Sequence, residues 1–226
     1  MKTYLDKSIQ LLGEENIKSL GDKTVLVIGL GGVGGTALEA LARSGLKKFV
    51  LIDFDKVDET NLNRQVLYTK DDVGRNKVEA AKDRLLKINP EFEIATQNLK
   101  IEECTLNDLN VGKVDFIIDA IDYIPGKLHI IEYSIKNRIP FITSLGMGNR
   151  LNPEDVTLTK LNNTENDPLA KKLRYEVKQK GLDLKEINVV FSKEIPLIKS
   201  PKPASMMMVP STAGLIIAKY VLSTIL

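Results

Sequence analysis

The sequence predicts an α/β protein with a Rossmann-like, doubly wound and mostly parallel sheet. Apolar runs of strand length alternate with amphipathic helical patterns, a glycine-rich turn joins the first strand to the first helix, and this alternation ends near residue 145. Buried parallel strands are continuous apolar runs, and their alternation with helices is typical of doubly wound sheets. We expect one domain, with a nucleotide-binding core at 1–145 and a substrate-side elaboration at 146–226 that ends in a helix.

Each core element has its own signal. The run TVLVIG, residues 24–29, is apolar and β-branched and ends in glycine, as a buried strand before a tight turn does. The first helix has small residues on one face and stops at Gly45, and a later amphipathic helix ends before Pro90. The expected core elements are, in chain order, strand 24–29, helix 33–45, strand 48–53, helix 74–90, strands 91–99 and 114–120, helix 128–138 and strand 139–145.

The elaboration has a different pattern from the core. Residues 155–161 and 187–195 are expected to form strands that flank a basic helix at 167–181. Residues 199–205, KSPKPAS, have the composition of a mobile loop. Pro210 then opens a final amphipathic helix, because proline is tolerated in the first turn.

Composition limits the function classes. A hydrophobic content of 43% and a charged content of 27% are ordinary for a soluble globular protein. The net charge of +2 neither demands nor excludes a nucleic-acid partner. The one cysteine, Cys104, excludes an internal disulfide and a multi-cysteine zinc site. No signal-peptide pattern opens the chain, and the apolar stretch 215–226 is too short to span a bilayer, so we expect a cytoplasmic protein without stable membrane insertion.

A glycine-rich turn, Gly29-Leu30-Gly31-Gly32-Val33-Gly34, follows the first strand and opens a helix. Glycines let a phosphate approach the backbone, and the helix N-terminus then offers N–H groups and a partial positive charge. Asp53 ends the next strand, where a carboxylate accepts hydrogen bonds from ribose hydroxyls. These residues alone predict a nucleotide site and favour NAD over ATP.

Residues beyond Asp53 reverse that preference. Arg64 and Lys77 are cations that a dehydrogenase does not need beside its ribose-binding strand, whereas a triphosphate needs fixed cations to offset its charge. Asp119 and Asp122 follow the fourth strand, and a carboxylate at the carboxyl edge of a parallel sheet suits a Mg²⁺ ion held beside phosphates.

Five motifs together resemble the ThiF/MoeB/HesA superfamily of ATP-dependent adenylating enzymes, which includes the ubiquitin-activating enzymes. They are GLGGVG (29–34), DFD (53–55), NLNRQ (61–65), NKVEAAKDRLLKINP (76–90) and DAID (119–122). The resemblance implies a homodimer that binds ATP and Mg²⁺. The implied nucleotide contacts are Gly29, Gly31, Gly32 and Gly34 at the phosphates, Asp53 and Asp55 at the ribose, Asn61, Arg64, Gln65 and Lys77 at the triphosphate, and Asp119 and Asp122 at the metal side, with Mg²⁺ on Asp122.

The implied catalytic residues are Arg64, Lys77 and Asp122, with Lys7 from the neighbouring subunit. Superfamily members commonly supply an arginine from that N-terminal segment to the γ-phosphate. Lysine keeps the charge but loses the planar fork of the guanidinium group.

The C-terminal third resembles the bacterial tRNA threonylcarbamoyladenosine dehydratases (TcdA, also called CsdL), through ITSLGMGNRLNPEDVTLTKL, NDPLAKKLR, VVFSKE and VPSTAGLIIA. This resemblance implies adenylation of a carboxylate on a modified tRNA base and ring closure without an enzyme thiol, with sulfur-relay proteins as further partners. It fits Cys104, whose neighbouring glutamates disfavour a reactive thiolate. The alternatives are an activator of a sulfur-carrier or ubiquitin-like protein, and a nucleotide- or NAD-binding protein of another class.

A tRNA substrate directs attention to the basic helix. Six basic residues stand against two acidic ones between residues 171 and 185, and no aromatic platform for base stacking is evident. We expect RNA contacts from Lys171, Lys172, Arg174 and Lys178. His129 is expected to have a packing or surface role, and the methionines at 206–208 are expected to lie in the core or on an edge strand.

Overall fold

The computed structural model describes residues 3–101, 106, 108–109, 111–198, 200 and 203–226. It contains one seven-stranded sheet with the strand order β3-β2-β1-β4-β5-β7-β6. The strands are β1 (Thr24–Ile28), β2 (Lys48–Ile52), β3 (Glu93–Gln97), β4 (Phe116–Asp119), β5 (Phe141–Ser144), β6 (Val156–Lys160) and β7 (Asn188–Ser192). All neighbouring strands pair in parallel except β6 and β7, which are antiparallel. The predicted fold class is confirmed.

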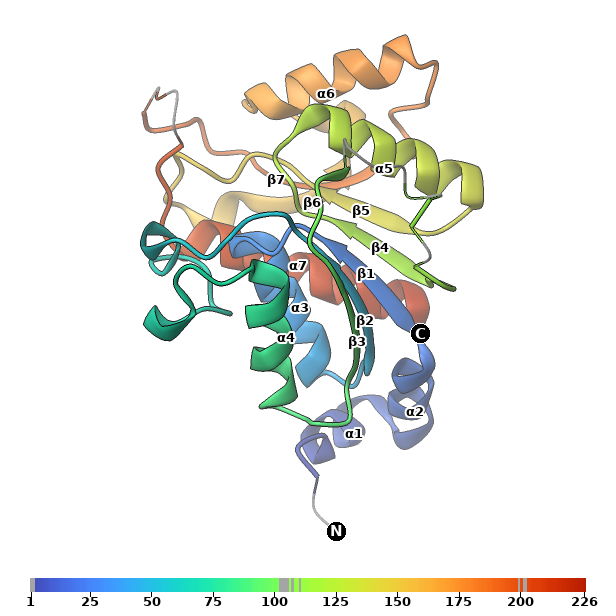
Figure 1. The fold of residues 1–226 in the computed structure, drawn as a ribbon. Coiled ribbons are helices and arrows are strands. Elements are labelled where there is room, and N and C mark those ends of the chain that lie inside the picture. The colour runs from blue at the N-terminus through green and yellow to red at the C-terminus, as the bar shows by residue number, and fades with distance from the viewer. Residues whose placement is uncertain (1–2, 102–105, 107, 110, 199, 201–202) are drawn as a thin grey trace.

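Helices cover both faces of this sheet (Figure 1). They are α1 (Asp6–Leu12), α2 (Glu14–Asp22), α3 (Gly32–Arg43), α4 (Lys77–Leu86), α5 (Ile124–Asn137), α6 (Pro168–Gln179) and α7 (Met208–Ile225). Helices α3, α4 and α7 lie on one face, and α5 and α6 lie on the other (Figure 1). The helix pair α1 and α2 was not expected from the sequence, because α1 buries none of its residues and α2 buries only a few.

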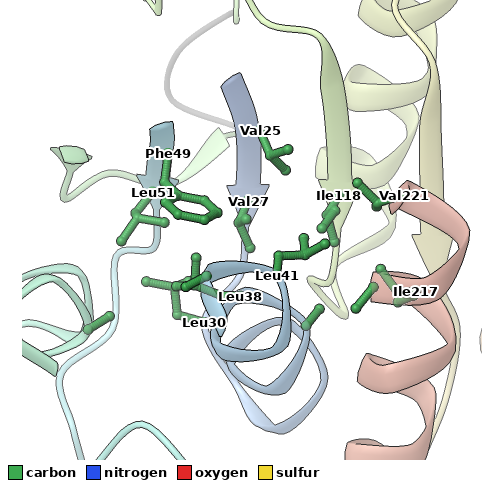
Figure 2. Close-up of a cluster of buried hydrophobic side chains, with 14 of the residues drawn as sticks. Val25, Val27, Leu30, Leu38, Leu41, Phe49, Leu51, Ile118, Ile217 and Val221 are labelled. Atoms are coloured by element: carbon green, nitrogen blue, oxygen red, sulfur yellow. The ribbon is translucent and has the colours of Figure 1, made fainter. Parts of the chain in front are cut away.

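The core divides into two layers because successive strand residues point to opposite faces. On one face, Val25 and Val27 of β1 pack with α3 and with Ile217 of α7 (Figure 2). On the other face, Leu26 and Ile28 pack among apolar residues of β2, β4 and α5. Each of these β1 side chains is at most 1% exposed, so β1 is covered from both sides as a central parallel strand should be.

The order of the strands locates a crevice. The chain winds outward from β1 through β2 to β3, then returns to the other side of β1 and continues through β4 and β5. Ligands of open α/β sheets bind beyond the carboxyl ends of the strands at such a reversal. The reversal lies between β1 and β4, so the residues after Ile28 and Asp119 border the crevice.

The elaboration joins the same sheet. Both strands expected at 155–161 and 187–195 are present, and β7 inserts between β5 and β6. The described part of the expected mobile loop is anchored, because Ala204 N–H donates to Asn149 Oδ1 at 2.8 Å. The core or edge-strand interpretation of the methionines is wrong, since Met206, Met207 and Met208 are 54%, 43% and 40% exposed.

Helix α7 begins at Met208, earlier than expected, and among the helices of the described residues it is the one long and apolar enough to cross a membrane. A helix that packs in a protein core can have the same length and composition. Here α7 packs along α3 and contributes Ile217 and Val221 to the core (Figure 2). Packing thus accounts for part of its apolar character, whereas Leu215 of the same helix is 56% exposed.

Candidate functional site

A cavity of about 940 Å³ lies beyond the carboxyl ends of β1, β2, β4 and β5. This volume is in the range of about 300–1,000 Å³ in which small molecules and cofactors are bound. Ten of the residues predicted to contact the nucleotide line it: Gly29, Gly31, Gly32, Asp53, Asp55, Asn61, Arg64, Gln65, Lys77 and Asp122. The fold thus brings together residues that are far apart in the sequence, from Gly29 to Asp122, a separation of 93 positions (122 − 29).

The glycine turn allows the backbone to form one wall of the cavity. Gly29 has φ +90°, and a Cβ there would lie 2.8 Å from the backbone of Ala120, so a side chain would collide with the neighbouring strand end. Helix α3 starts at Gly32, and Gly31 before it provides no side-chain cap. The first N–H groups of a helix have no partner within the helix, so this end of α3 suits an anion.

Gly34 was expected at the phosphates, and the structure places it elsewhere. It is absent from the cavity lining, and a Cβ on it would lie 1.9 Å from Gly29 O. The residue must therefore be glycine so that α3 can pack against the end of β1. This is the packing role that the third glycine of such turns has in dinucleotide-binding folds.

Asp53 holds the glycine turn in place. Its carboxylate accepts the N–H of Leu30 at 2.7 Å and the N–H of Asp55 at 2.8 Å. Burial raises the pKa of the Asp53 carboxyl above its usual value, and the charge of nearby Lys77 and the two backbone N–H donors oppose that rise. Asp53 also lines the cavity, so its carboxylate can accept a further hydrogen bond from a ligand there.

Lys77 is positioned as a fixed cation. Its side chain is only 6% exposed, and Nζ pairs with Asp55 Oδ2 at 2.7 Å. Lys77 is also the first residue of α4, and its N–H donates to Asp55 O at 3.0 Å. Asp55, which was expected at the ribose, therefore binds the cation that was expected at the phosphates.

Arg64 and Gln65 extend from the turn after η1 (Glu59–Asn61). The Arg64 guanidinium donates to Thr60 O at 2.7 Å and to Asn63 Oδ1 at 2.9 Å. Gln65 is buried, and among the described residues its Oε1 is the one buried side-chain nitrogen or oxygen atom without a hydrogen-bond partner. An unsatisfied buried amide oxygen in a cavity wall fits a ligand that carries hydroxyl or amino donors.

Asp119 was expected beside the nucleotide, and this expectation is wrong. Its carboxylate has no exposure, and both oxygens accept from Lys127 Nζ at 3.1 Å. It also accepts from the Thr143 hydroxyl and from Ile121 N–H. Lys127 Nζ donates in addition to Ser144 O at 2.6 Å. The pair joins the ends of β4 and β5 beneath the cavity, out of reach of a ligand.

Asp122, three residues later, is exposed and lines the cavity. Among the described residues no group of three or more His, Cys, Asp or Glu side chains has the arrangement of a metal site. Mg²⁺ is commonly bound by one or two carboxylates together with substrate phosphates and water. A lone carboxylate at this edge fits that mode of binding.

Sequence reasoning missed part of the cavity rim. Lys100 Nζ lies 4.5 Å from the ring centre of Tyr123 and 5.6 Å from that of Phe54, and all three residues line the cavity. Phe54 is the middle residue of the DFD motif. The motif alone did not predict that its side chain would be exposed (53%) at the cavity rim. Ser205 closes another side, where its carbonyl accepts from Asn63 Nδ2 at 2.8 Å.

The basic side chains of helix α6 are of two kinds, some exposed to solvent and one engaged in hydrogen bonds within the protein. Lys171, Lys172 and Lys178 are exposed, whereas Arg174 Nη1 donates to the carbonyl and hydroxyl oxygens of Thr164. Arg174 was expected to contact RNA, and the structure shows it fixing the start of α6. Tyr175, 61% exposed among the three lysines, is an aromatic side chain that the sequence interpretation overlooked.

Of three further residues considered in the sequence, two lie away from the cavity and one is not among the residues that the structure describes. Lys7 is exposed on α1, which lies at the opposite end of the sheet from the cavity, so its role in a neighbouring subunit stays a prediction (Figure 1). His129 is exposed on α5 and is absent from the cavity lining. Cys104 lies outside the described residues.

Comparisons with known proteins agree with this geometry. The model of the ThiF family matches residues 5–168. The chain is similar to the tRNA threonylcarbamoyladenosine dehydratase of Bacillus subtilis, with 36% identity over 95% of this chain and 91% of the relative. It also resembles the solved structure of the Escherichia coli dehydratase TcdA in complex with ATP, with a TM-score of 0.91, 33% identity, and coverage of 98% of this chain and 93% of that one. The same enzyme in complex with AMP gives a TM-score of 0.90 at 33% identity over 97% of this chain and 92% of that one.

Proposed function

Because this chain belongs to the ThiF family, we propose that it uses ATP to activate the carboxylate of threonylcarbamoyladenosine in tRNA and then closes that group into a ring. The observation that carries the proposal is similarity to the dehydratases over 95% of the chain, which includes the elaboration beyond residue 168 that the family model does not match. The cavity supplies the groups that such an activation requires.

We propose one orientation for ATP in the cavity. The phosphates lie at the glycine turn and the N-terminus of α3, with Arg64 and Lys77 as their cations. The ribose would lie toward Asp53, whose carboxylate can accept from hydroxyl groups, and Gln65, whose Nε2 lies beside Gly31, would stay on the triphosphate side as the resemblance implies. In this orientation the α-phosphate faces the part of the cavity formed by Asp122 and the residues after β5.

Adenylation converts a poor electrophile into a good one. A carboxylate oxygen of the substrate attacks the α-phosphorus, the bond to the bridging oxygen of the β-phosphate breaks, and pyrophosphate leaves. Negative charge develops on the phosphate oxygens during this step, and preorganised cations stabilise it. Arg64 and Lys77 perform that task, and Lys77 is already held in place by Asp55 at 2.7 Å.

The second step needs no enzyme nucleophile. An oxygen atom of the substrate attacks the activated acyl carbon. The bond between that carbon and the phosphate oxygen of AMP breaks, AMP leaves, and a proton is released as the ring closes. The reaction is intramolecular, so the enzyme only has to position the reacting group of the substrate and exclude water. The net change in the tRNA is the loss of one water molecule, for which the cell spends one ATP.

Asp122 would hold a Mg²⁺ ion together with the phosphates. When bound, the ion neutralises phosphate charge and orients the pyrophosphate leaving group. The Asp122 carboxylate would contribute by fixing the position of the Mg²⁺ ion near the end of β4.

The proposed assembly is a cytoplasmic homodimer. Lys7 would then extend from the N-terminal segment of one subunit toward the γ-phosphate in the cavity of the other, and sulfur-relay proteins remain proposed partners. Analytical ultracentrifugation of the purified chain, with and without ATP, would measure the oligomeric state on which the role of Lys7 depends.

Mass spectrometry of tRNA nucleosides tests the function directly. The purified protein is incubated with ATP and with tRNA that contains threonylcarbamoyladenosine, and the tRNA is then digested under mild conditions. We expect the modified nucleoside to lose the mass of one water and AMP to appear in equal amount. An unchanged nucleoside, in the presence of a protein that binds ATP, would refute the proposal.

Replacing Asp122 with asparagine should separate metal from adenosine binding. The substitution keeps the side chain's size but removes the charge that Mg²⁺ requires. We expect Mg²⁺-dependent turnover to fall by about a hundredfold or more, since metal-assisted charge stabilisation is worth several kcal/mol. Calorimetric titration should show AMP affinity within twofold of the unaltered protein. Equal losses of AMP and MgATP affinity would contradict the assignment.

Replacing Lys171, Lys172 and Lys178 with glutamate should weaken tRNA binding. Each lost phosphate contact reduces the slope of log K against log salt by about one unit, so the salt dependence should flatten. The matched control replaces Lys18, Lys87 and Lys113, which are also exposed, and changes the net charge equally. Filter binding at several salt concentrations measures both triple variants. Identical tRNA affinities in the two variants would show that α6 is only a solvated surface.

A further inference from the structure

A second cavity, also of about 940 Å³, lies beside the nucleotide cavity. The two share four lining residues, Gly146, Gly148, Leu169 and Pro203, so they are neighbouring parts of one opening. The second cavity is bordered by the loop after β5, the N-terminal turn of α6 and the segment after β7. None of the predicted nucleotide contacts lies in it.

Its walls are held by a buried arginine. Arg150 is 5% exposed, and its guanidinium donates to the carbonyl oxygens of Gly146 at 2.6 Å, Gly148 at 3.2 Å, Asn166 at 3.0 Å and Glu194 at 3.1 Å. These carbonyls belong to three different segments, so one side chain fixes the shape of the cavity. A site whose shape is fixed in advance loses less entropy when a ligand binds.

The lining combines an apolar wall with a positive rim. Ile195, Pro196 and Ile198 form an apolar side, although Ile195 is 70% and Ile198 49% exposed. Lys171 and Arg174 stand at the α6 side. The one acidic residue of the lining, Asp167, accepts from the N–H groups of Gly146, Leu169 and Ala170, so its charge is engaged by backbone donors.

We propose that this second cavity receives the purine base that carries the reacting carboxylate, turned out of the RNA chain; the inference rests on the proposed function. Enzymes that act on a nucleobase take it out of the stack and hold it between apolar surfaces. The flat base would lie against Leu169 and Ile198, while the side chain attached to it passes Gly146 and Gly148 to the α-phosphate in the first cavity. The phosphates of the same RNA segment would lie over Lys171 and the other lysines of α6.

Two adjacent leucine and isoleucine positions provide a matched test. Ile198 lines the second cavity, whereas Leu197 beside it does not, and both are exposed, so neither substitution has to disturb the core. Ile198→Trp should occupy the cavity, and Leu197→Trp should add the same bulk outside it. Ile195→Trp serves as a second filling variant from the same wall.

The filling variants should lose base recognition and keep everything else. We expect kcat/KM for tRNA to fall at least tenfold in Ile198→Trp and in Ile195→Trp, and to stay within twofold in Leu197→Trp. ATP affinity and the salt slope of tRNA binding should match the unaltered protein in all three, because the glycine turn and the lysines of α6 are untouched. The free nucleoside threonylcarbamoyladenosine, titrated in the presence of AMP and followed by ligand-observed NMR, should bind to Leu197→Trp but not to the filling variants.

The outcomes separate the two proposals. If the unaltered protein fails to dehydrate tRNA, the proposed function is wrong. If it succeeds, and both filling variants retain its kcat/KM and bind the free nucleoside, the base is held elsewhere and the inference about the second cavity is overturned.

Discussion

Replacing Lys127 with methionine is expected to reduce the free energy of unfolding by about 3–5 kcal/mol, because it leaves an unpaired charge in the core. Lys127 and Asp119 have no exposure, and Lys127 Nζ joins the Asp119 carboxylate to Ser144 O. Methionine has a similar volume but no charge, so the Asp119 carboxylate would lose its compensating partner. Urea unfolding measured by circular dichroism gives the change.

The double variant Lys127→Met with Asp119→Asn supplies the control. Neutralising both members removes the uncompensated charge, so we expect the double variant to regain most of the lost stability. Nucleotide affinity of the folded double variant should stay close to that of the unaltered protein, since neither side chain lines the cavity. A single variant as stable as the unaltered protein would refute the role of Lys127 in compensating the buried Asp119 carboxylate.

Replacing Arg64 or Lys77 with alanine is expected to reduce adenylation by about a hundredfold or more while the fold persists. Each change removes a cation beside the transferring phosphate, which is worth about 3 kcal/mol of transition-state stabilisation. Stability should change little, since Arg64 bonds only to neighbours in its own turn, and Asp55, the partner of Lys77, is 47% exposed and remains solvated. Formation of AMP from radiolabelled ATP, with tRNA present, measures the loss.

Lys87→Ala is the matched control, because Lys87 is exposed at the C-terminal end of α4 while Lys77 begins it. Its rate should equal that of the unaltered protein. Rates near normal in both cavity variants would reject the assignment of the triphosphate to this side of the cavity.

The central strands β1, β2 and β4 were predictable because each is a continuous apolar run, whereas the edge strand β3 mixes polar and apolar residues. The expected strand at 24–29 and the observed β1 at Thr24–Ile28 differ by one residue at one end. Helices α1 and α2 were missed for the opposite reason. α1 has only seven residues and buries none of them, although Leu5, Ile9 and Leu12 have helical spacing, and both helices lie at the margin of the core.

The site shows which residues sequence can place and which it cannot. Gly32 and Gly34 stand in the same motif, and only the structure reveals that Gly34 serves the fold, because a Cβ added to Gly34 would overlap Gly29 O. Asp119 and Asp122 likewise share a motif. They separate because Asp119 lies at the end of β4 and meets Lys127 from the next helix, a partner that no local pattern names.

Helix α7 covers α3, the helix that begins the nucleotide site, although α7 follows α3 at a long distance in the chain. Gly214 of α7 lies so close to α3 that a Cβ on it would be 2.6 Å from Val33 O, and Pro210 at the start of α7 lies in the cavity wall beside Gly32. Because chains are made from the N-terminus, α3 leaves the ribosome with that side uncovered and stays so until α7 has been made. Until then the nascent chain carries an apolar surface that promotes aggregation, and the wall of the nucleotide site is completed only when α7 packs onto α3.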